Sequence, residues 1–289
     1  MDLTRINNIL ITIDVEDWFQ VENLRPWFPF TKWGNQIQRV EYNTNSLLDL
    51  FDKFSRPVKA TFFILGWIAE RLPNLVSNIQ NRGHEIASHG YHHVLNNQMK
   101  DEHLRKDILS SKKLLEDLSG KIIAGYRAPS FSINNKILQV IKESGYKYDS
   151  SYNSFEMHGR YGVISTNGYK RKGIAIQFDQ EFHELPISNL QILNQTIPWG
   201  GGGYFRFFPP AVFIKGVRRI LNSSGTYLFY MHPWEIDAKQ PKVDCPRSLS
   251  IWRHYLNLNK THKRLEKMIA YFQNCNFLTC SQYLDLLNR

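Results

Sequence analysis

The sequence predicts an α/β fold arranged as a single distorted (β/α) barrel. Short apolar segments typical of buried strands alternate with segments of roughly 10 to 18 residues that have helical periodicity, as in parallel βαβ units. The chain has 289 residues, of which 42% are hydrophobic, so it can fill a sizeable core. Polar residues repeatedly follow the ends of the predicted strands, which is typical of the catalytic rim of a barrel.

The first third of the chain is predicted to contain three strands and two helices. The apolar run at 9–13 predicts a strand over 9–15. In the aromatic segment that follows, 18–33, Pro26 and Pro29 break any helical pattern. The next elements are a helix over 43–54 with leucine and phenylalanine on its buried side, a strand over 59–66, a helix over 68–81 that ends before Gly83, and a strand over 84–88.

The same alternation continues in the rest of the chain. It gives a helix over 101–118 that stops at Gly120, a strand over 121–126, a helix over 134–144 and a short strand over 146–149. A less regular region, 150–209, precedes a helix over 210–222, a strand over 226–231, a helix over 258–274, a strand over 277–280 and a short final helix. Because no internal repeat is present, we interpret residues 1–289 as one domain, with its motifs over 9–235 and a C-terminal portion over 236–289.

Composition narrows the class of protein. The formal net charge is +10, but lysine and arginine are scattered along the chain, so we expect a soluble basic enzyme and no nucleic-acid partner. Cys245, Cys275 and Cys280 form no CxxC pair, which argues against a disulfide framework or a cysteine zinc site. No stretch approaches the roughly 20 apolar residues of a membrane span, and no signal peptide is evident, so we expect a cytoplasmic protein with reduced thiols.

A pair of histidines indicates a metal site. His89 and His93 are four residues apart, so one helical turn would place both imidazoles on the same face, about 5–6 Å apart at Cβ. The acidic cluster 14–17, directly after the first strand, is the obvious source of a third ligand. Two histidines and one carboxylate leave a coordination position for water, which is typical of a catalytic divalent metal site.

Five polar residues share one position relative to the predicted strands. Each of them comes at or just past the C-terminal end of a strand, where side chains of α/β barrels converge on substrate. They are Asp14, His89, Arg127, Asp149 and His232.

Six motifs together resemble one known family. They are Thr12-Ile13-Asp14-Val15-Glu16, Lys59-Ala60-Thr61-Phe62-Phe63, Gly83 to His89 with His93, Arg127-Ala128-Pro129-Ser130, Tyr148-Asp149-Ser150-Ser151 and Tyr230-Met231-His232-Pro233. In this order they are similar to the polysaccharide deacetylases of carbohydrate esterase family 4, the NodB-homology fold. The stretches 199–206 and 252–255 further resemble the branch of this family found in bacterial exopolysaccharide gene clusters.

The resemblance implies a fold, a cofactor and an activity. The fold would be the distorted (β/α) barrel of the NodB type, and the cofactor a divalent metal, most often Zn²⁺. The activity would be hydrolysis of the N-acetyl group of an N-acetylhexosamine unit. By match of motif, Asp14 would be the general base, Arg127 the residue that orients it, His232 the general acid, and His89 and His93 metal ligands.

The carboxylate ligand is the point at which the sequence departs from many family members. Those members carry the metal-binding Asp directly after the base, where this chain has Val15. Because alternate residues of a strand share a face, Glu16 points with Asp14, and we expect Glu16 to be the ligand with Asp17 as the second choice. Position 90, usually Ser or Thr in the family, is Gly90.

Further residues are expected around the substrate. A backbone N–H beside Tyr91 or His92 is a candidate oxyanion donor. Asp149 is expected to orient His232 or Arg127 or to cap a turn, and Glu184 to contact sugar or serve structure. Trp199 and the glycines 200–203 are expected to form a flexible lid. Glu235 is a candidate for tuning His232, and His84 and His92 are interpreted as structural.

Two other functions stay open beside a metal-dependent N-deacetylase of a bacterial polysaccharide or glycan precursor. One is an allantoinase-like hydrolase of cyclic amides on the same fold, and the other a catalytically inactive carbohydrate-binding barrel. The expected partner is an N-acetylated glycan, and peripheral contact with a lipid-linked glycan stays open. The sequence leaves open which glycan is used and how the chain oligomerises.

Overall fold

The computed structural model describes residues 6–155, 159, 161–193, 195–244 and 248–288. Ten strands form one sheet: β1 (Asn8–Val15), β2 (Ala60–Ile64), β3 (Glu85–Ser88), β4 (Gly125–Tyr126), β5 (Tyr148–Asp149), β6 (Lys170–Lys172), β7 (Ala175–Gln177), β8 (His183–Glu184), β11 (Thr226–Met231) and β12 (Asn276–Phe277). Their order is β11-β1-β2-β3-β4-β5-β8-β7-β6, and β12 also pairs with β1. The pairs from β11 to β8 are parallel, whereas β7 runs antiparallel to both β8 and β6.

Strand β1 pairs with β2, β11 and β12 and has two different faces. Ile9, Ile11 and Ile13 belong to the apolar cluster beneath the outer helices, whereas Leu10 packs with residues of the inner cluster. Since side chains alternate along a strand, Asp14 shares the inner face with Leu10. The apolar run that predicted β1 therefore also directs its polar end into the barrel.

Irregular segments complete the barrel between β8 and β11. Ser188 donates its backbone N–H to Leu228 of β11 at 3.3 Å, and Tyr230 donates to the carbonyl of Gly200 at 2.7 Å. Gly201 forms a further parallel bridge with Tyr230. These contacts replace regular strands, so the predicted distorted (β/α) barrel is confirmed. A separate two-stranded sheet pairs β9 (Asn189–Ile192) with β10 (Gln195–Pro198).

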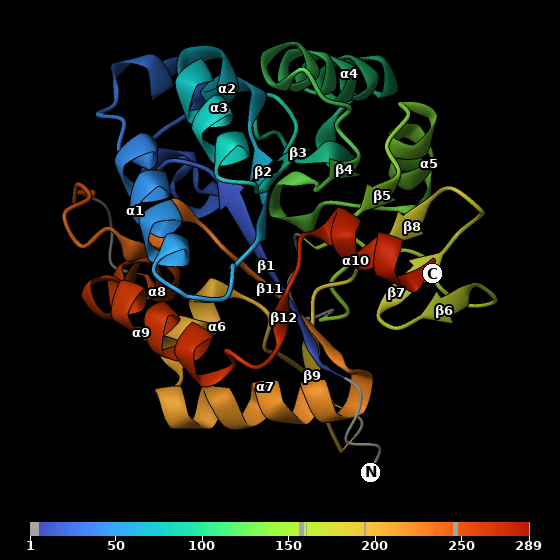
Figure 1. Cartoon of the computed structure of the whole chain (residues 1–289). Helices are drawn as coiled ribbons and strands as arrows, with labels where there is room; N and C mark the ends of the chain where they lie inside the picture. Colours follow the sequence, from blue (N-terminus) through green and yellow to red (C-terminus); the bar gives the residue numbers. More distant parts are fainter. Residues whose placement is uncertain (1–5, 156–158, 160, 194, 245–247, 289) are drawn as a thin grey trace.

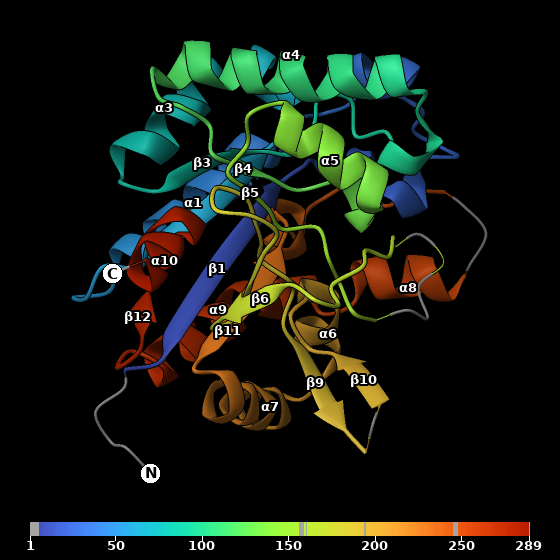
Figure 2. The same ribbon diagram turned by 90° about the vertical axis from the view of Figure 1, so that its right-hand side faces the viewer.

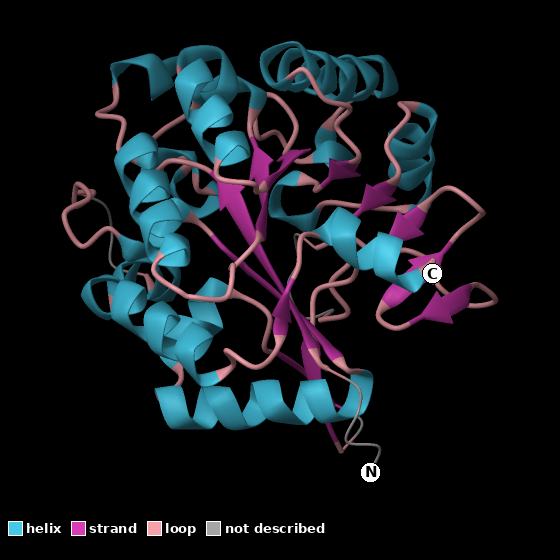
Figure 3. Cartoon of the chain, in the orientation of Figure 1, coloured by secondary structure: helices cyan, strands magenta, loops and turns pink. Residues whose placement is uncertain are grey.

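Helices surround this sheet (Figures 1 and 3). They are α1 (Val40–Asp52), α2 (Gly66–Arg71), α3 (Pro73–Asn81), α4 (Asp101–Ser119), α5 (Asn135–Glu143), α6 (Gly202–Phe207), α7 (Pro210–Ser224), α8 (Leu249–Tyr255), α9 (Leu258–Tyr271) and α10 (Cys280–Leu287). In the turned view, α4 and α5 lie on one side of β1 and α7 on the other (Figure 2). None of the helices in the described part of the chain has both the length and the apolar character needed to cross a membrane.

Several predicted elements differ from the structure in their bounds; the strand predicted over 121–126, for example, covers only Gly125–Tyr126. Two further differences have a clear local cause. The single helix predicted over 68–81 is wrong, because α2 ends at Arg71 and Pro73, which has no backbone N–H, starts α3 as its first residue. The strand predicted over 277–280 ends at Phe277, because the Thr279 side chain caps α10 by accepting a hydrogen bond from the Gln282 N–H. Cys275 and Cys280 are free thiols, and Cys245 lies outside the described residues.

Candidate active site

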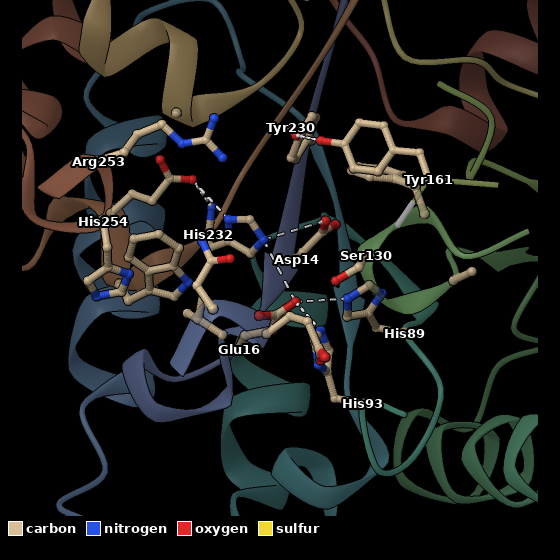
Figure 4. Close-up of a pocket in the computed structure, with 18 of the residues that line it drawn as sticks. Asp14, Glu16, His89, His93, Ser130, Tyr161, Tyr230, His232, Arg253 and His254 are labelled. Atoms are coloured by element: carbon tan, nitrogen blue, oxygen red, sulfur yellow. Dashed lines mark hydrogen bonds and ion pairs between the residues drawn. The ribbon is translucent and has the colours of Figure 1, made fainter. Parts of the chain in front are cut away.

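One pocket opens at the carboxyl ends of the parallel strands (Figure 4). Asp14 is the second-last residue of β1 and Glu16 directly follows this strand, His89 follows β3, and His232 follows β11. Strands that run in parallel bring these positions to one edge of the sheet. The pocket is lined by Asp14, Glu16, Val21, Glu22, Asn23, His89, His93, Ala128, Ser130, Phe131, Tyr161, Gly203, Arg206, Tyr230, His232, Trp234, Glu235, Arg253 and His254.

Three buried side chains converge at the bottom of this pocket. The Oε1 atom of Glu16 lies 2.9 Å from Nε2 of His89 and 2.9 Å from Nε2 of His93. One ligand atom from each residue lies within 4.8 Å of the other two, so a single ion can reach all three. The structure thus brings together the two histidines and Glu16, while Asp17 points elsewhere and accepts hydrogen bonds from the backbone N–H groups of Trp18, Arg39 and Val40.

The contacts of these histidines suit a cation at this point. His89 Nδ1 lies 2.8 Å from the carbonyl oxygen of Arg127, which can only accept, so Nδ1 carries the proton of the neutral ring. The lone pair on His89 Nε2 then faces the Glu16 carboxylate, a contact that is favourable only with a positive ion or a proton between them. His93 Nε2 is buried without a hydrogen-bond partner, although it is close to the same oxygen. These donors fit a divalent metal such as zinc.

The charge state of Glu16 agrees with this assignment. Burial alone would favour the neutral carboxyl group. The neighbouring His93, His232 and His89 outweigh burial and hold the pKa of Glu16 well below its ordinary value. A carboxylate that is ionised at neutral pH is a suitable ligand for a divalent cation.

The two histidine ligands lie on a loop and not on the predicted helical turn. Gly90 has φ +73° and His93 has φ +52°, so the backbone reverses direction between the ligands. Asp107 of α4 holds this loop, accepting the backbone N–H groups of Tyr91 at 2.8 Å and of His92 at 3.3 Å. Because both N–H groups are engaged by Asp107, the structure does not support the expectation that one of them holds an oxyanion.

The conformation of the loop explains the glycine at position 90. Its positive φ is one that other residues adopt only at a cost. A Cβ atom at Gly90 would also lie 2.9 Å from Oδ2 of Asp107. Glycine at position 90 thus suits both the positive φ and the nearby Asp107 carboxylate, whereas the Ser or Thr expected from the family would crowd Asp107.

Arg127 fixes Asp14 in the barrel interior. Its side chain is fully buried, and its Nη1 donates to Asp14 Oδ1 at 2.7 Å and to Thr12 Oγ1 at 2.7 Å. Nε and Nη2 donate to the carbonyl and hydroxyl oxygens of Ser150 at 2.9 and 2.8 Å, and the guanidinium lies 4.1 Å above the ring of Phe63. All three nitrogens of the guanidinium thus donate hydrogen bonds. Because Asp14 Oδ1 is bonded to Arg127, Asp14 Oδ2 is the oxygen that faces the pocket (Figure 4).

His232 faces the two acids of β1. Its Nε2 lies 4.0 Å from Asp14 Oδ2 and 3.7 Å from Glu16 Oε1, and its Nδ1 lies 2.9 Å from Glu235 Oε1. Burial lowers the affinity of the ring for a proton, but these three carboxylates outweigh burial and raise the pKa of His232 to about 9. The ring is therefore a proton donor at neutral pH.

Arg206 was missed in the sequence as a site residue. Its Nε donates to Glu235 Oε2 at 2.7 Å, and both side chains are buried. Burial opposes ionisation of Glu235, yet Arg206 and His232 hold the pKa of Glu235 at about 2. A Cβ atom at Gly202 would collide with this carboxylate, so the glycine run just before Arg206 was the available signal. The expectation that Glu235 contacts His232 agrees with the geometry.

Four residues expected to bind substrate lie outside the pocket lining, namely Tyr91, Asp149, Glu184 and Trp199. Tyr91 packs its ring on Gly66 at the start of α2, and burial raises its pKa to about 12. Trp199 is buried, stacks against Phe213 and donates Nε1–H to the Phe213 carbonyl at 3.0 Å. Residues 199–201 are thus part of the packed core beside β11, and the predicted flexible lid is wrong.

Asp149 and Glu184 form a buried carboxyl pair behind the pocket. Burial and the neighbouring Asp149 raise the pKa of Glu184 well above its ordinary value, so Glu184 is protonated. Asp149 accepts hydrogen bonds from both the backbone N–H and the hydroxyl of Ser151, and the Ser151 hydroxyl accepts the N–H of Ala128. Asp149 therefore caps a turn and supports the segment after Arg127 and does not contact His232.

Aromatic residues form two walls of the pocket that the motifs did not single out. Phe131 packs edge-on against Tyr161 and Tyr230, with ring centroids 5.2 and 4.8 Å apart. Ser130 and Phe131 have φ +51° and +57°, so two successive residues in left-handed conformation turn this wall into the pocket. On the other side, Trp234 stacks between His232 and His254 at 5.2 and 4.5 Å.

Two family models match adjacent parts of the chain. Residues 36–148 match the polysaccharide deacetylase model, and residues 150–285 match a domain of unknown function, DUF3473. The first model covers His89, His93 and Arg127, and the second covers Arg206, His232 and Glu235. The pocket is thus built from both matched segments and from β1, which precedes them.

Known proteins resemble the chain in sequence and in fold. A peptidoglycan deacetylase of Helicobacter pylori is 35% identical over 171 residues, which is 58% of this chain and 56% of the relative. A candidate polysaccharide deacetylase from Mycobacterium smegmatis superposes with a TM-score of 0.63 at 20% identity, covering 100% of this chain and 92% of the other. Puue allantoinase superposes at 0.60 and 14% identity, covering 99% and 91%. Both structural likenesses concern the fold alone.

The curated relatives are longer than the matched region. The chain spans 47% and 56% of the length of two of them, or about half. Residues 36–148 are thus similar to polysaccharide deacetylases, and the curated relatives that match the chain over part of their length are named as deacetylases of peptidoglycan.

Proposed function

We propose that this protein is a metal-dependent hydrolase that removes the acetyl group from N-acetylhexosamine units of a bacterial polysaccharide or glycan precursor. The observation that carries the proposal is the convergence of Glu16, His89 and His93 on one point, with Asp14 and His232 beside it. The relatives that are peptidoglycan deacetylases support the same class of reaction.

Glu16, His89 and His93 would hold a divalent cation, with zinc the ion that suits their nitrogen and carboxylate ligands best. Such an ion supplies a polarising charge for an acetyl carbonyl and lowers the pKa of water. The hydrogen bond from His89 Nδ1 to the Arg127 carbonyl orients the imidazole and leaves Nε2 free to coordinate.

Asp14 is placed to act as the general base. Its Oδ1 is occupied by Arg127, while its Oδ2 faces the pocket and can take the proton of the attacking water. Arg127 keeps the carboxylate in one orientation, so the base is positioned before substrate arrives.

His232 is placed to act as the general acid. Breaking the amide C–N bond requires a proton on the departing nitrogen, and Nε2 of His232 is the ring nitrogen that faces Asp14 and Glu16. Glu235 accepts the hydrogen bond from Nδ1–H and so keeps the second proton of the imidazolium in place. The balanced products are acetate and the free amine.

Acetate release from an N-acetylglucosamine oligomer tests the proposal. The metal-free protein should be inactive, addition of zinc should restore release, and Asp14→Asn should abolish turnover while still binding zinc. Full activity of the metal-free protein on allantoin, a cyclic amide, would contradict the proposal. Zinc-loaded protein that binds the oligomer but releases no acetate would instead indicate an inactive carbohydrate-binding barrel.

A further inference from the structure

The carboxylates of the pocket are nearly all matched by cations of the chain. Three of the four acidic residues in the lining form ion pairs with arginines, and the fourth, Glu16, lies among histidines. The pairs are Asp14 with Arg127 at 2.7 Å, Glu22 with Arg25 at 2.9 Å, and Glu235 with Arg206 at 2.7 Å.

Arg253 is the cation of this lining that lacks such a match. No carboxylate among the described residues lies within ion-pair distance of its guanidinium, which lies 6.0 Å from the centre of the Tyr204 ring. Figure 4 shows Arg253 across the pocket from His89. A partly buried guanidinium without a counter-charge faces the space that a substrate would enter.

The backbone of Arg253 is held in place. Nη1 of Arg206 donates to the carbonyl of Arg253 at 3.0 Å and to that of His254 at 2.9 Å. The His254 ring stacks on Trp234 at 4.5 Å, with an angle of 18° between the planes. The backbone of Arg253 is therefore fixed relative to the stacked rings of His254, Trp234 and His232. The Arg253 side chain extends from this fixed point.

We propose that Arg253 binds an anionic substituent, a carboxylate or a phosphate, carried by the glycan substrate. A guanidinium presents paired N–H donors that match the oxygens of either group. The substituent would take the counter-ion position that no carboxylate of the described chain takes. The positive charge of Arg253 would in turn offset the repulsion between an acidic glycan and the carboxylates at 14, 16 and 22. This inference rests on the proposed function and names the substrate class within it.

Three N-acetylated substrates that differ in charge test the inference. They are a neutral N-acetylglucosamine oligomer, an oligomer in which N-acetylmuramic acid supplies a carboxylate, and UDP-N-acetylglucosamine, which supplies phosphates. The wild-type protein should favour one anionic substrate over the neutral one in kcat/KM. Arg253→Gln should reduce this preference roughly tenfold, as expected for one charge-assisted contact, and Arg253→Lys should restore part of it.

Arg218→Gln is the matched control, because Arg218 is exposed on α7 and does not line the pocket. It should keep the wild-type preference. The anionic substrate that loses most in Arg253→Gln identifies whether the bound group is a carboxylate or a phosphate. An equal loss on all three substrates, or an unchanged preference, would overturn the inference.

Binding separates this inference from the proposed function. Affinities of the three glycans are measured by titration calorimetry with Asp14→Asn protein loaded with zinc. If no acetate is released by wild type but an anionic glycan binds about tenfold more tightly than the neutral one, and Arg253→Gln removes the difference, the proposed function fails and the inference stands. Equal affinities for all three glycans would overturn the inference even if acetate is released.

Discussion

Arg127 donates a hydrogen bond to Asp14 at 2.7 Å from a position with no exposure to solvent, so the ends of β1 and β4 are joined by a buried ion pair. Removing one member leaves the other charge buried and unpaired. We expect Arg127→Met to lower the free energy of unfolding by roughly 3–5 kcal/mol in urea denaturation. The double variant Arg127→Met/Asp14→Asn should recover much of this loss, and a double variant no more stable than the single one would contradict the explanation.

Metal stoichiometry tests the ligand set. His89→Ala, His93→Ala and Glu16→Gln should each bind much less zinc than the wild type, measured by elemental analysis after dialysis, because each loses one of three ligands. His92→Ala is the matched control, since His92 lies in the same loop but hydrogen bonds to Asp107. Zinc retained by Glu16→Gln and lost by Asp17→Asn would mean that the carboxylate ligand is misassigned.

Glu235 is expected to act on the rate through His232. In Glu235→Gln the ring loses a charged acceptor at Nδ1, so kcat for acetate release should fall about 10- to 100-fold, which is part of the contribution of a general acid. KM should stay within about threefold, because Glu235 is directed at His232 and Arg206 and not at the bulk of the pocket. A rise in KM with an unchanged kcat would indicate a role in binding instead.

We predict that Gly90 is needed for zinc binding as well as for the conformation of its own backbone. Gly90→Ala and Gly120→Ala both place a side chain at positive φ, +73° and +63°, but nothing lies within 4 Å of the second. Each should lose roughly 1 kcal/mol of stability from strain. Only Gly90→Ala should also weaken zinc binding, because Asp107 must move and the loop with it. Equal zinc affinities in both variants would refute this coupling.

His84 makes stability depend on pH. Burial, with Lys59 and Arg82 nearby, lowers the pKa of His84 to about 4, and its Nδ1 accepts the N–H of Ala60. In the unfolded chain the pKa is about 6.5, so as the pH falls below that value the unfolded state takes up a proton that the folded state does not, and stability is lost.

The size of this effect can be measured by urea unfolding at pH 7 and pH 5. The loss of stability between these values should be about 2 kcal/mol smaller in His84→Gln than in the wild type. His262→Gln, a change at a residue of α9 that is only partly buried, is the control and should keep the wild-type dependence. An identical pH dependence in His84→Gln and wild type would show that His84 is protonated in the folded state.

The sequence predicted the parts of the site that depend on strand periodicity. Glu16 was preferred over Asp17 because it shares a face with Asp14, and the structure brings Glu16 to the histidines while Asp17 caps a neighbouring turn. The approach of His89 to His93 was also expected, but the helix invoked for it is absent. Two residues four apart can meet through a glycine turn as well as through a helix, and spacing alone does not distinguish the two.

The parts that depend on tertiary packing could not be predicted. Trp199 and the glycines after it have the composition of a mobile loop, yet residues 199–201 pack beside β11. The missing side chains at Gly200, Gly201 and Gly202 make room for neighbouring residues. Arg206 falls in the irregular region 150–209, ahead of the helix predicted over 210–222. The structural role of Arg206 depends on Glu235, 29 positions later, and on carbonyls about 50 positions away. No local sequence pattern encodes contacts over such separations.

The guanidinium of Arg206 connects the last part of the chain to the surroundings of His232. Arg206 donates hydrogen bonds to the carbonyls of Arg253, His254 and Leu256. It also donates to Glu235, the carboxylate that contacts His232. Grafting this pocket onto a shorter barrel from a distant relative would therefore fail unless α8 came with it. Under the proposed function, substitutions in that helix would change the surroundings of His232 while leaving Asp14 and the three candidate metal ligands unaltered.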